Sequence, residues 1–417
     1  MLIKTLLNKV KRFKSFVYDT VQIITIAGTE ALVIDIRSRS NSKPKCPECG
    51  QRCAAYDRQP QRLFEHIPIW TLKVYFCYAP RRVSCPEHGI KVEALPWAQG
   101  KGQMTCSYKV YLARWARRLS WKETADVFET SWDTVSRAVK FVVDYGLAHR
   151  NLDGVTEIGV DEIAVFKGHK YLTLVYQLNA EARKLLWCGH ERRVKTLLNF
   201  FREFGKERSA QLTFVCSDMW APFLKVIAKK APQALNILDR FHIMRKLNVA
   251  IGEIRRSEVN QFKANKQENV LKRGRWLLLK RPENLTEKQT VRLAELFKIN
   301  LSSIKGCLMR EDFQQFWEYQ RCDFAGKFLD NWVTRTLQTD LEPMKKVARM
   351  LRKHKPLILN WFKAKGRLSS GAVEGLNLKA KLTMRKAYGF KTLKCLEIAL
   401  YHTLGKLPEP EHTHRFY

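Results

Sequence analysis

Three acidic residues far apart in the sequence stand in contexts that suit metal-dependent phosphoryl transfer: Asp161, Asp218 and Glu374. Transfer of a phosphodiester requires an attacking oxygen held in line and neutralisation of charge on the phosphate, and two divalent ions about 3.5–4 Å apart supply both. Hard ions such as Mg²⁺ bind carboxylate oxygens. The three acids therefore predict a site for Mg²⁺ or Mn²⁺, with Glu162 and Asp239 as alternative ligands.

The elements that carry these acids must be brought together by the fold. Asp161 lies in the strand-like run TEIGVDEIAVF, Asp218 follows the buried-type strand LTFVC, and Glu374 lies near the start of the last predicted helix. The elements after Gly154 follow the order β-β-β-α-β-α-β, which indicates a mixed α/β core. An aspartate at a strand end is more often a helix cap or a surface residue, so each acid alone is weak evidence.

Two short motifs upstream, CPECG and CPEHG, predict a metal site of a different kind. The predicted ligands are Cys46, Cys49, Cys85 and His88. A pair of ligands two residues apart on a turn suits one tetrahedral Zn²⁺, and four ligands without an open position indicate a structural ion. The long connection between the pairs predicts a ribbon-like module rather than a groove-reading finger. The alternative is two turns with incidental cysteines. Cys53 and Cys77 are the alternative ligands, but neither has a partner at the same spacing.

Residues 104–150 carry a helix-turn-helix pattern. Ser120 and Glu123 have the form of a capping box, and Thr130 is predicted to cap the second helix. The face of this helix predicted to be buried carries Trp132, Val135, Val139 and Val142. The face predicted to contact bases and phosphates carries Asp133, Thr134, Ser136, Arg137 and Lys140. The alternative is an ordinary helical hairpin with a solvated outer face.

The charge balance predicts a polyanionic partner. Lys and Arg number 75 against 40 Asp and Glu, a net charge of +35 spread along the whole length. Nucleic acid is the best match, ahead of a ribosome-like or membrane-surface role. No run of about 18 apolar residues is present, which excludes a membrane-spanning helix. Eleven cysteines in such a chain favour thiols and metal over disulfides, and the expected location is the cytoplasm, on the nucleoid.

A series of motifs, in this order along the chain, resembles the ISL-three (ISL3) family of insertion-sequence transposases. The series is CPECG, RRVSCPEHG, the helix-turn-helix, GVDEIAVFKGHKYLTLVYQL, CSDMWAPF, LDRFHIMRKLN and SGAVEGLNLKAKLTMRKAYGF. The resemblance implies a DDE catalytic domain of ribonuclease-H-like fold, in which Asp161, Asp218 and Glu374 are the catalytic acids. It also marks Asp239 and His242 as a pair near the active site. His242 is expected to support the acids or contact DNA; alternatively, it completes hydrogen bonds at a helix start.

The expected fold is multidomain α+β. The expected domains are an N-terminal basic segment and hairpin (1–44), a zinc-ribbon-like module (45–92), a helix-turn-helix domain (104–150), a ribonuclease-H-like core (154–243 and 362–400), a helical insertion (244–361) and a tail (401–417). The insertion is expected to touch DNA, since residues 240–298 hold fifteen Lys and Arg against six acids.

The expected function is that of a transposase. It would bind the terminal inverted repeats of its own element and catalyse Mg²⁺-dependent strand cleavage and strand transfer on double-stranded DNA. It would act as a homodimer or larger assembly, because two ends must be paired. The alternatives are a DNA-binding regulator or inactivated relative without cleavage, and a repair or recombination nuclease of the same fold.

Overall fold

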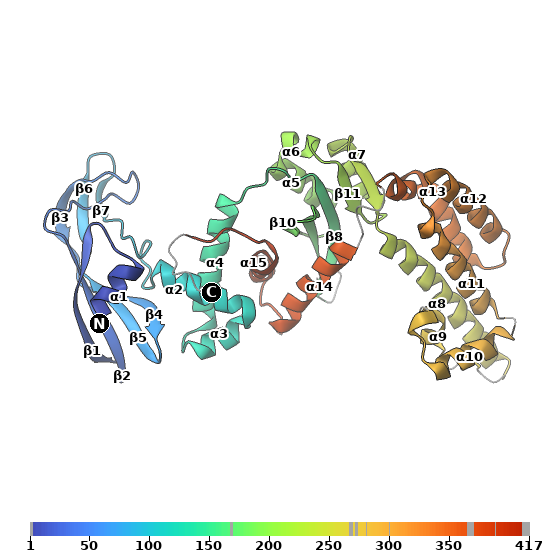
Figure 1. Ribbon diagram of the computed structural model, residues 1–417, viewed down its shortest axis with the longest axis horizontal. Helices are drawn as coiled ribbons and strands as arrows, with labels where there is room; N and C mark the ends of the chain where they lie inside the picture. Colours follow the sequence, from blue (N-terminus) through green and yellow to red (C-terminus); the bar gives the residue numbers. More distant parts are fainter. Residues whose placement is uncertain are drawn as a thin grey trace. The chain divides into compact units, whose positions relative to one another are not determined.

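The structure is a computed structural model, shown in Figure 1. It describes residues 3–166, 170–266, 270–271, 274–280, 282–299, 301–364, 371–387 and 389–410. The chain divides into two compact units: unit 1 comprises Met1–Asn151 and Leu382–Tyr417, and unit 2 comprises Leu152–Lys381. The Lys-Gly-His segment 167–169 of the motif GVDEIAVFKGHKYLTLVYQL and residues 411–417 of the expected tail lie outside the described residues.

Unit 1 begins with α1 (Ile3–Val10) and two β-sheets. The strands are β1 (Phe16–Ile26), β2 (Thr29–Ser38), β3 (Ala54–Arg58), β4 (Arg62–Ile69), β5 (Leu72–Tyr78), β6 (Arg81–Cys85) and β7 (Gly89–Val92). One sheet has the order β1-β2-β5-β4 and the other the order β3-β6-β7. The parallel pairing of β2 with β5 joins residues on both sides of the expected boundary at residue 44 into one sheet. Trp97 packs in the core of this sheet, against the rings of Phe16 and Tyr78.

Three helices follow in unit 1: α2 (Cys106–Arg118), α3 (Trp121–Val127) and α4 (Trp132–His149). The predicted capping box of Ser120 and Glu123 is confirmed at the start of α3. The predicted cap at Thr130 is wrong, because Ser131 caps α4 by accepting from the amide of Thr134. Trp132 was predicted to be buried but is 43% exposed. It is the first residue of the helix, and its side chain points back beyond the first turn.

The end of the described chain completes unit 1. Helix α15 (Leu393–Leu404) packs along α4. The carboxylate of Glu409 then pairs with Arg114 and Arg117 of α2, each at 2.9 Å. Helices from both ends of the sequence therefore share one core.

Unit 2 contains a five-stranded sheet of order β10-β9-β8-β11-β12. The strands are β8 (Glu157–Phe166), β9 (Lys170–Gln177), β10 (Lys184–His190), β11 (Phe214–Ser217) and β12 (Leu235–Leu238). β8, β9 and β10 are antiparallel neighbours, whereas β11 and β12 run parallel to β8. With α5 (Val194–Phe204) and α7 (Ala221–Lys230), this confirms the predicted order β-β-β-α-β-α-β; the short α6 (Lys206–Ala210) is additional.

Alternate residues of β8 pack against different helices. Ile158 and Val160 share a buried cluster with side chains of α5 and α7. Gly159 faces α14 (Gly371–Lys386) instead, and a Cβ atom on Gly159 would lie 2.6 Å from Cγ2 of Val373. Successive residues of a strand point to opposite faces, so α14 covers the face that α5 and α7 leave open. In Figure 1, α14 lies beside β8.

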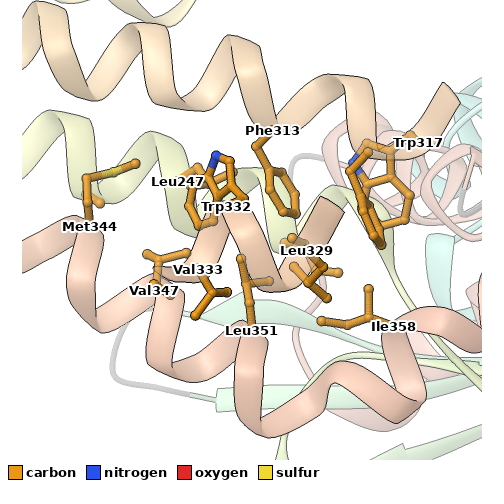
Figure 2. Close-up of a cluster of buried hydrophobic side chains, with 14 of the residues drawn as sticks. Leu247, Phe313, Trp317, Leu329, Trp332, Val333, Met344, Val347, Leu351 and Ile358 are labelled. Carbon is orange, nitrogen blue, oxygen red and sulfur yellow. The ribbon is translucent and has the colours of Figure 1, made fainter. Parts of the chain in front are cut away.

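A helical insertion separates β12 from α14. Its helices are α8 (Arg240–Ala264), α9 (Arg275–Leu279), η1 (Pro282–Asn284), α10 (Glu287–Phe297), α11 (Ser302–Gln314), η2 (Gln315–Glu318), α12 (Cys322–Leu337) and α13 (Glu342–Lys363). Figure 2 shows its core, where Phe313, Trp332 and Leu351 are almost fully buried. Asn360 of α13 donates to the carbonyl of Asn236 in β12 at 2.9 Å, which anchors the insertion to the sheet.

Candidate active site

Three aspartates lie at one level of the parallel strands: Asp218 and Asp239 directly follow β11 and β12, and Asp161 lies within β8 beside these strand ends. Cys216 of β11 pairs with Gly159 of β8, so Asp218 and Asp161, each two residues further along, fall at the same level of neighbouring strands. Leu238 of β12 pairs with Ser217, and the amide of Asp239 donates to the carbonyl of Ser217 at 3.0 Å. Neighbouring strands are about 4.8 Å apart, so the backbone sets the three acids in one row.

Asp161 is held by α14. Its Oδ2 accepts a hydrogen bond from the side-chain amide of Asn377, and its Oδ1 accepts from the amide of Glu162 at 2.8 Å. The hydroxyl of Tyr176 on β9 donates to Oδ1 of Asn377 at 2.8 Å, which fixes the orientation of the amide group. Burial raises the pKa of Asp161 above its ordinary value, and the nearby His242 opposes that increase.

Asp218 is held by Arg192, which follows β10. The guanidinium pairs with Oδ2 of Asp218 and donates through Nε to Oε1 of Glu162 at 3.0 Å. The amide of Trp220 donates to Oδ1 of Asp218 at 2.9 Å. Burial, followed by the charge of Asp218, raises the pKa of Glu162 to about 8, although Arg192 acts in the opposite direction. Glu162 and Asp218 therefore share one counter-cation.

Asp239 and His242 form the start of α8. Asp239 is 5% exposed and accepts from the amide of Phe241 at 2.8 Å and from Nδ1 of His242 at 3.1 Å. Both oxygens of Asp239 therefore accept hydrogen bonds from the first turn of α8. The hydrogen bond to Asp239 raises the pKa of His242, and the charges of Asp161 and Asp218 add to this effect. His242 therefore lies close enough to both aspartates to interact with their charges.

Glu374 lies in the first turn of α14 and is exposed. Among the described residues, no group of three His, Cys, Asp or Glu ligand atoms within 4.8 Å of one another includes Glu374 or the aspartates. Glu374 is three residues before Asn377, and residues three apart lie on the same face of a helix, with Cβ atoms about 5–6 Å apart. The helix therefore presents Glu374 on the face that contacts Asp161, one turn away from that contact.

The row of acids suits a hard divalent cation. Asp161 and Asp218 offer carboxylate oxygens, the donors that Mg²⁺ and Mn²⁺ prefer. The guanidinium of Arg192 already takes the place of a cation on Asp218. The residues therefore fit such an ion in chemical type, and the strand register sets Asp161 and Asp218 on neighbouring strands at the same level.

The predicted zinc ligands come together in unit 1. The ligand atoms of Cys46, Cys49, Cys85 and His88 all lie within 4.8 Å of one another. Cys49 Sγ is 3.7 Å from Cys85 Sγ, and His88 Nδ1 is 3.5 Å from Cys85 Sγ and 3.9 Å from Cys46 Sγ. Tetrahedral Zn²⁺ with bonds of about 2.0–2.3 Å requires separations of about 3.5–3.8 Å. The set therefore fits zinc, and Glu48, 3.5 Å from Nε2 of His88, can orient the ring.

The predicted DNA-contacting residues of α4 differ in exposure. Asp133, Arg137 and Lys140 are exposed, whereas Thr134 and Ser136 are half-buried. Arg137 pairs with Asp133 at 3.2 Å, and Lys140 pairs with Asp144. These are exposed pairs one turn apart, which are weak in water, so phosphates can displace them.

Two residues at the acidic row were not identified from the sequence. Asn377 stands three residues after Glu374, and this helical spacing was the available signal. Arg192 lies in a connection without periodic pattern, where no local signal marks a contact with Asp218.

Comparison with known proteins identifies the family of this chain. The family model of DDE transposases of the ISL3 type, described as "Transposase", matches residues 158–400. The chain is 27% identical over 349 residues to the transposase for insertion sequence element IS1001 of Bordetella parapertussis, a match that covers 83% of this chain and 85% of that protein. It is also 27% identical over 412 residues to the transposase for insertion sequence element IS1557 of Mycobacterium tuberculosis, covering 92% and 91% of the two chains.

None of the helices in the described part of the chain is long and apolar enough to span a membrane. The family model covers more than half of the chain and contains the whole acidic row. The chain therefore belongs to the ISL3 family of transposases, enzymes that cut and join DNA.

Proposed function

We propose that this transposase binds the terminal inverted repeats of its own insertion sequence and catalyses metal-dependent strand cleavage and strand transfer. The observation that carries the proposal is the alignment of Asp161 and Asp218 at the same level of neighbouring parallel strands, with α14 fixed to Asp161 through Asn377. The sheet of three antiparallel and two parallel strands, with helices on both faces, supports a ribonuclease-H-like core.

Asp161, Asp218 and Glu374 would hold Mg²⁺ or Mn²⁺. The bound ions would orient the attacking oxygen and neutralise charge on the scissile phosphate. Asn377 orients Asp161 for this task. His242, held by Asp239, adds a positive charge beside the two aspartates, where it can support their ionised forms or meet the DNA backbone.

Recognition of the DNA ends falls to unit 1 in this proposal. A structural Zn²⁺ on Cys46, Cys49, Cys85 and His88 would hold the turns around β6 and β7, and the outer face of α4 would read the DNA. The basic insertion of residues 244–361 would bind DNA with little sequence preference, at the nucleoid. We expect a homodimer or larger assembly, since two ends must be paired for transfer.

The test uses the purified full-length protein with Mg²⁺ and DNA that carries the element's own ends, beside scrambled ends. We expect cleavage of the native ends. Asp161→Asn, Asp218→Asn and Glu374→Gln should lower cleavage at least about a hundredfold while end binding persists.

Three outcomes contradict the proposal. Binding without any metal-dependent product would support a regulator or inactivated relative. Equal cleavage of native and scrambled ends would support a nuclease. Cleavage close to the wild-type rate in one variant would remove that residue from the set of metal ligands.

A further inference from the structure

The loop between β10 and α5 presents Arg192 to the acidic row. The residue before it, Glu191, has φ of 68°, a left-handed backbone that is uncommon outside glycine. Hydrogen bonds hold that residue in place: its amide donates to the carbonyl of Tyr171, and its carbonyl accepts from the hydroxyl of Thr173, each at 2.9 Å. Two bonds to β9 therefore fix the point from which the guanidinium reaches across the site.

Three partners surround the guanidinium. It pairs with Oδ2 of Asp218 and with Oε1 of Glu162, and its central carbon lies 4.6 Å from the ring centroid of Trp220. The side chains of Glu162 and Asp218 are 8% and 14% exposed, so these contacts lie largely out of water. A guanidinium over an indole ring that also donates to two separate carboxylates suits arginine and not lysine.

Both carboxylate oxygens of Asp218 already have a hydrogen-bond donor. Oδ1 accepts from the backbone amide of Trp220, and Oδ2 pairs with Arg192. The amide is fixed at the start of α7, whereas the Arg192 side chain is 34% exposed and can rotate. A divalent ion that binds Asp218 therefore competes with Arg192, because two cations repel each other strongly at a single carboxylate.

On the basis of the metal-dependent function proposed above, we propose that Arg192 is a positioning residue that acts as the built-in counter-cation of Asp218. It neutralises this carboxylate while no divalent ion is bound and releases Oδ2 when one binds. Glu162 and Trp220 keep the released guanidinium at the edge of the site, where it can face a DNA phosphate. The guanidinium thereby lowers the affinity of Asp218 for divalent ions.

The test measures Mn²⁺ binding to the full-length protein without DNA, by electron paramagnetic resonance of the free ion. We expect Arg192→Gln to bind Mn²⁺ about tenfold more tightly than the wild type, because a positive charge beside the ion is removed. Arg192→Lys keeps the charge but loses the fork, so we expect a smaller gain of about threefold. Arg193→Gln is the matched control: Arg193 is the next residue, is exposed and pairs only with Glu191 in the described contacts, at 3.0 Å, so its loss should leave Mn²⁺ affinity unchanged.

Equal or weaker Mn²⁺ binding by Arg192→Gln overturns the role of Arg192. If circular dichroism shows that this variant is unfolded, equal or weaker binding by Arg192→Lys overturns it instead. Asp218→Asn separates this proposal from the one on which it rests. Loss of Mn²⁺ binding in Asp218→Asn together with no gain in Arg192→Gln refutes the role of Arg192 alone, whereas undiminished binding in Asp218→Asn removes the proposed metal site and the role of Arg192 with it.

Discussion

Single side chains in this protein owe their properties to partners on distant segments. The amide of Asn377 reaches Asp161 across more than two hundred residues of sequence, and the hydroxyl of Tyr176 holds that amide in turn. An unsupported carboxylate rotates, and hydrogen-bonded neighbours that fix a metal ligand contribute to metal affinity. The environment of Asp161 is therefore built by α14 and β9 as well as by its own strand.

His402 of α15 predicts a pH dependence of stability. It is 4% exposed, and burial, followed by the charges of Arg117 and Lys386, lowers its pKa from 6.5 to about 3. Above pH 6.5 the imidazole is neutral in both the folded and the unfolded chain, so its ionisation does not affect stability there. As the pH falls from 6.5 towards 3, only the unfolded chain gains the proton, so stability falls by up to about 1.4 kcal/mol per pH unit.

Urea unfolding between pH 7 and pH 4 measures this effect. We expect His402→Leu to lose markedly less stability than the wild type over that range, because leucine fills the space without titrating. His149→Gln on the exposed end of α4 is the control and should follow the wild type. Identical pH curves for His402→Leu and the wild type would show that His402 is not the group responsible.

At the scale of elements, the close approach of α14 to β8 depends on Gly159. A methyl group there would meet Val373 at 2.6 Å and Leu178 at 3.1 Å. We expect Gly159→Ala to lower the free energy of unfolding by about 1–3 kcal/mol, as overpacking of a core does. We also expect it to lower cleavage, because it displaces the helix that carries Glu374 and Asn377.

Gly252 offers the matched control, because a Cβ atom at this position of α8 meets nothing within 4 Å. Gly252→Ala should leave stability unchanged or raise it by up to about 1 kcal/mol. Urea unfolding and end-cleavage assays on both variants make the comparison. Full stability and full cleavage in Gly159→Ala would show that α14 does not need this close contact.

Local sequence patterns predicted most helices and strands, but they did not predict contacts between segments far apart in the sequence. Strand-like runs of residues marked β8 and β9, and a Ser-x-x-Glu pattern marked the start of α3, because both depend on neighbours in sequence. The parallel pairing of β2 with β5 and the reach of Arg192 to Asp218 depend on which segments meet in space. The start of α4 was misplaced by one residue because Thr130 and Ser131 are both good caps.

At the scale of the whole molecule, the zinc site lies in a different unit from the acidic row. We expect removal of zinc by a chelator, or Cys85→Ser, to abolish end recognition and to expose residues 45–92 to protease. Fragments of unit 2 should remain resistant. The physical reason is that four ligands on two turns lose their common anchor, whereas the core of unit 2 contains no residue of the quartet.

Zinc content, binding to the element ends and limited proteolysis are measured on the same chelated protein and on Cys85→Ser. Cys53→Ser is the control: Cys53 lies near the quartet but outside the set whose ligand atoms converge, so zinc content should stay normal. Normal end binding by protein that holds no zinc would refute the structural role of the ion.

The return of α15 to α4 sets an order for folding during synthesis. Residues up to Asn151 leave the ribosome first, but the packing of unit 1 needs Leu382 and the residues after it, so the whole of unit 2 is translated in between. At about 5–20 residues per second, the amino-terminal part waits roughly 10–50 s for its last helix. Unit 1 therefore completes its packing only after the whole of unit 2 has been translated.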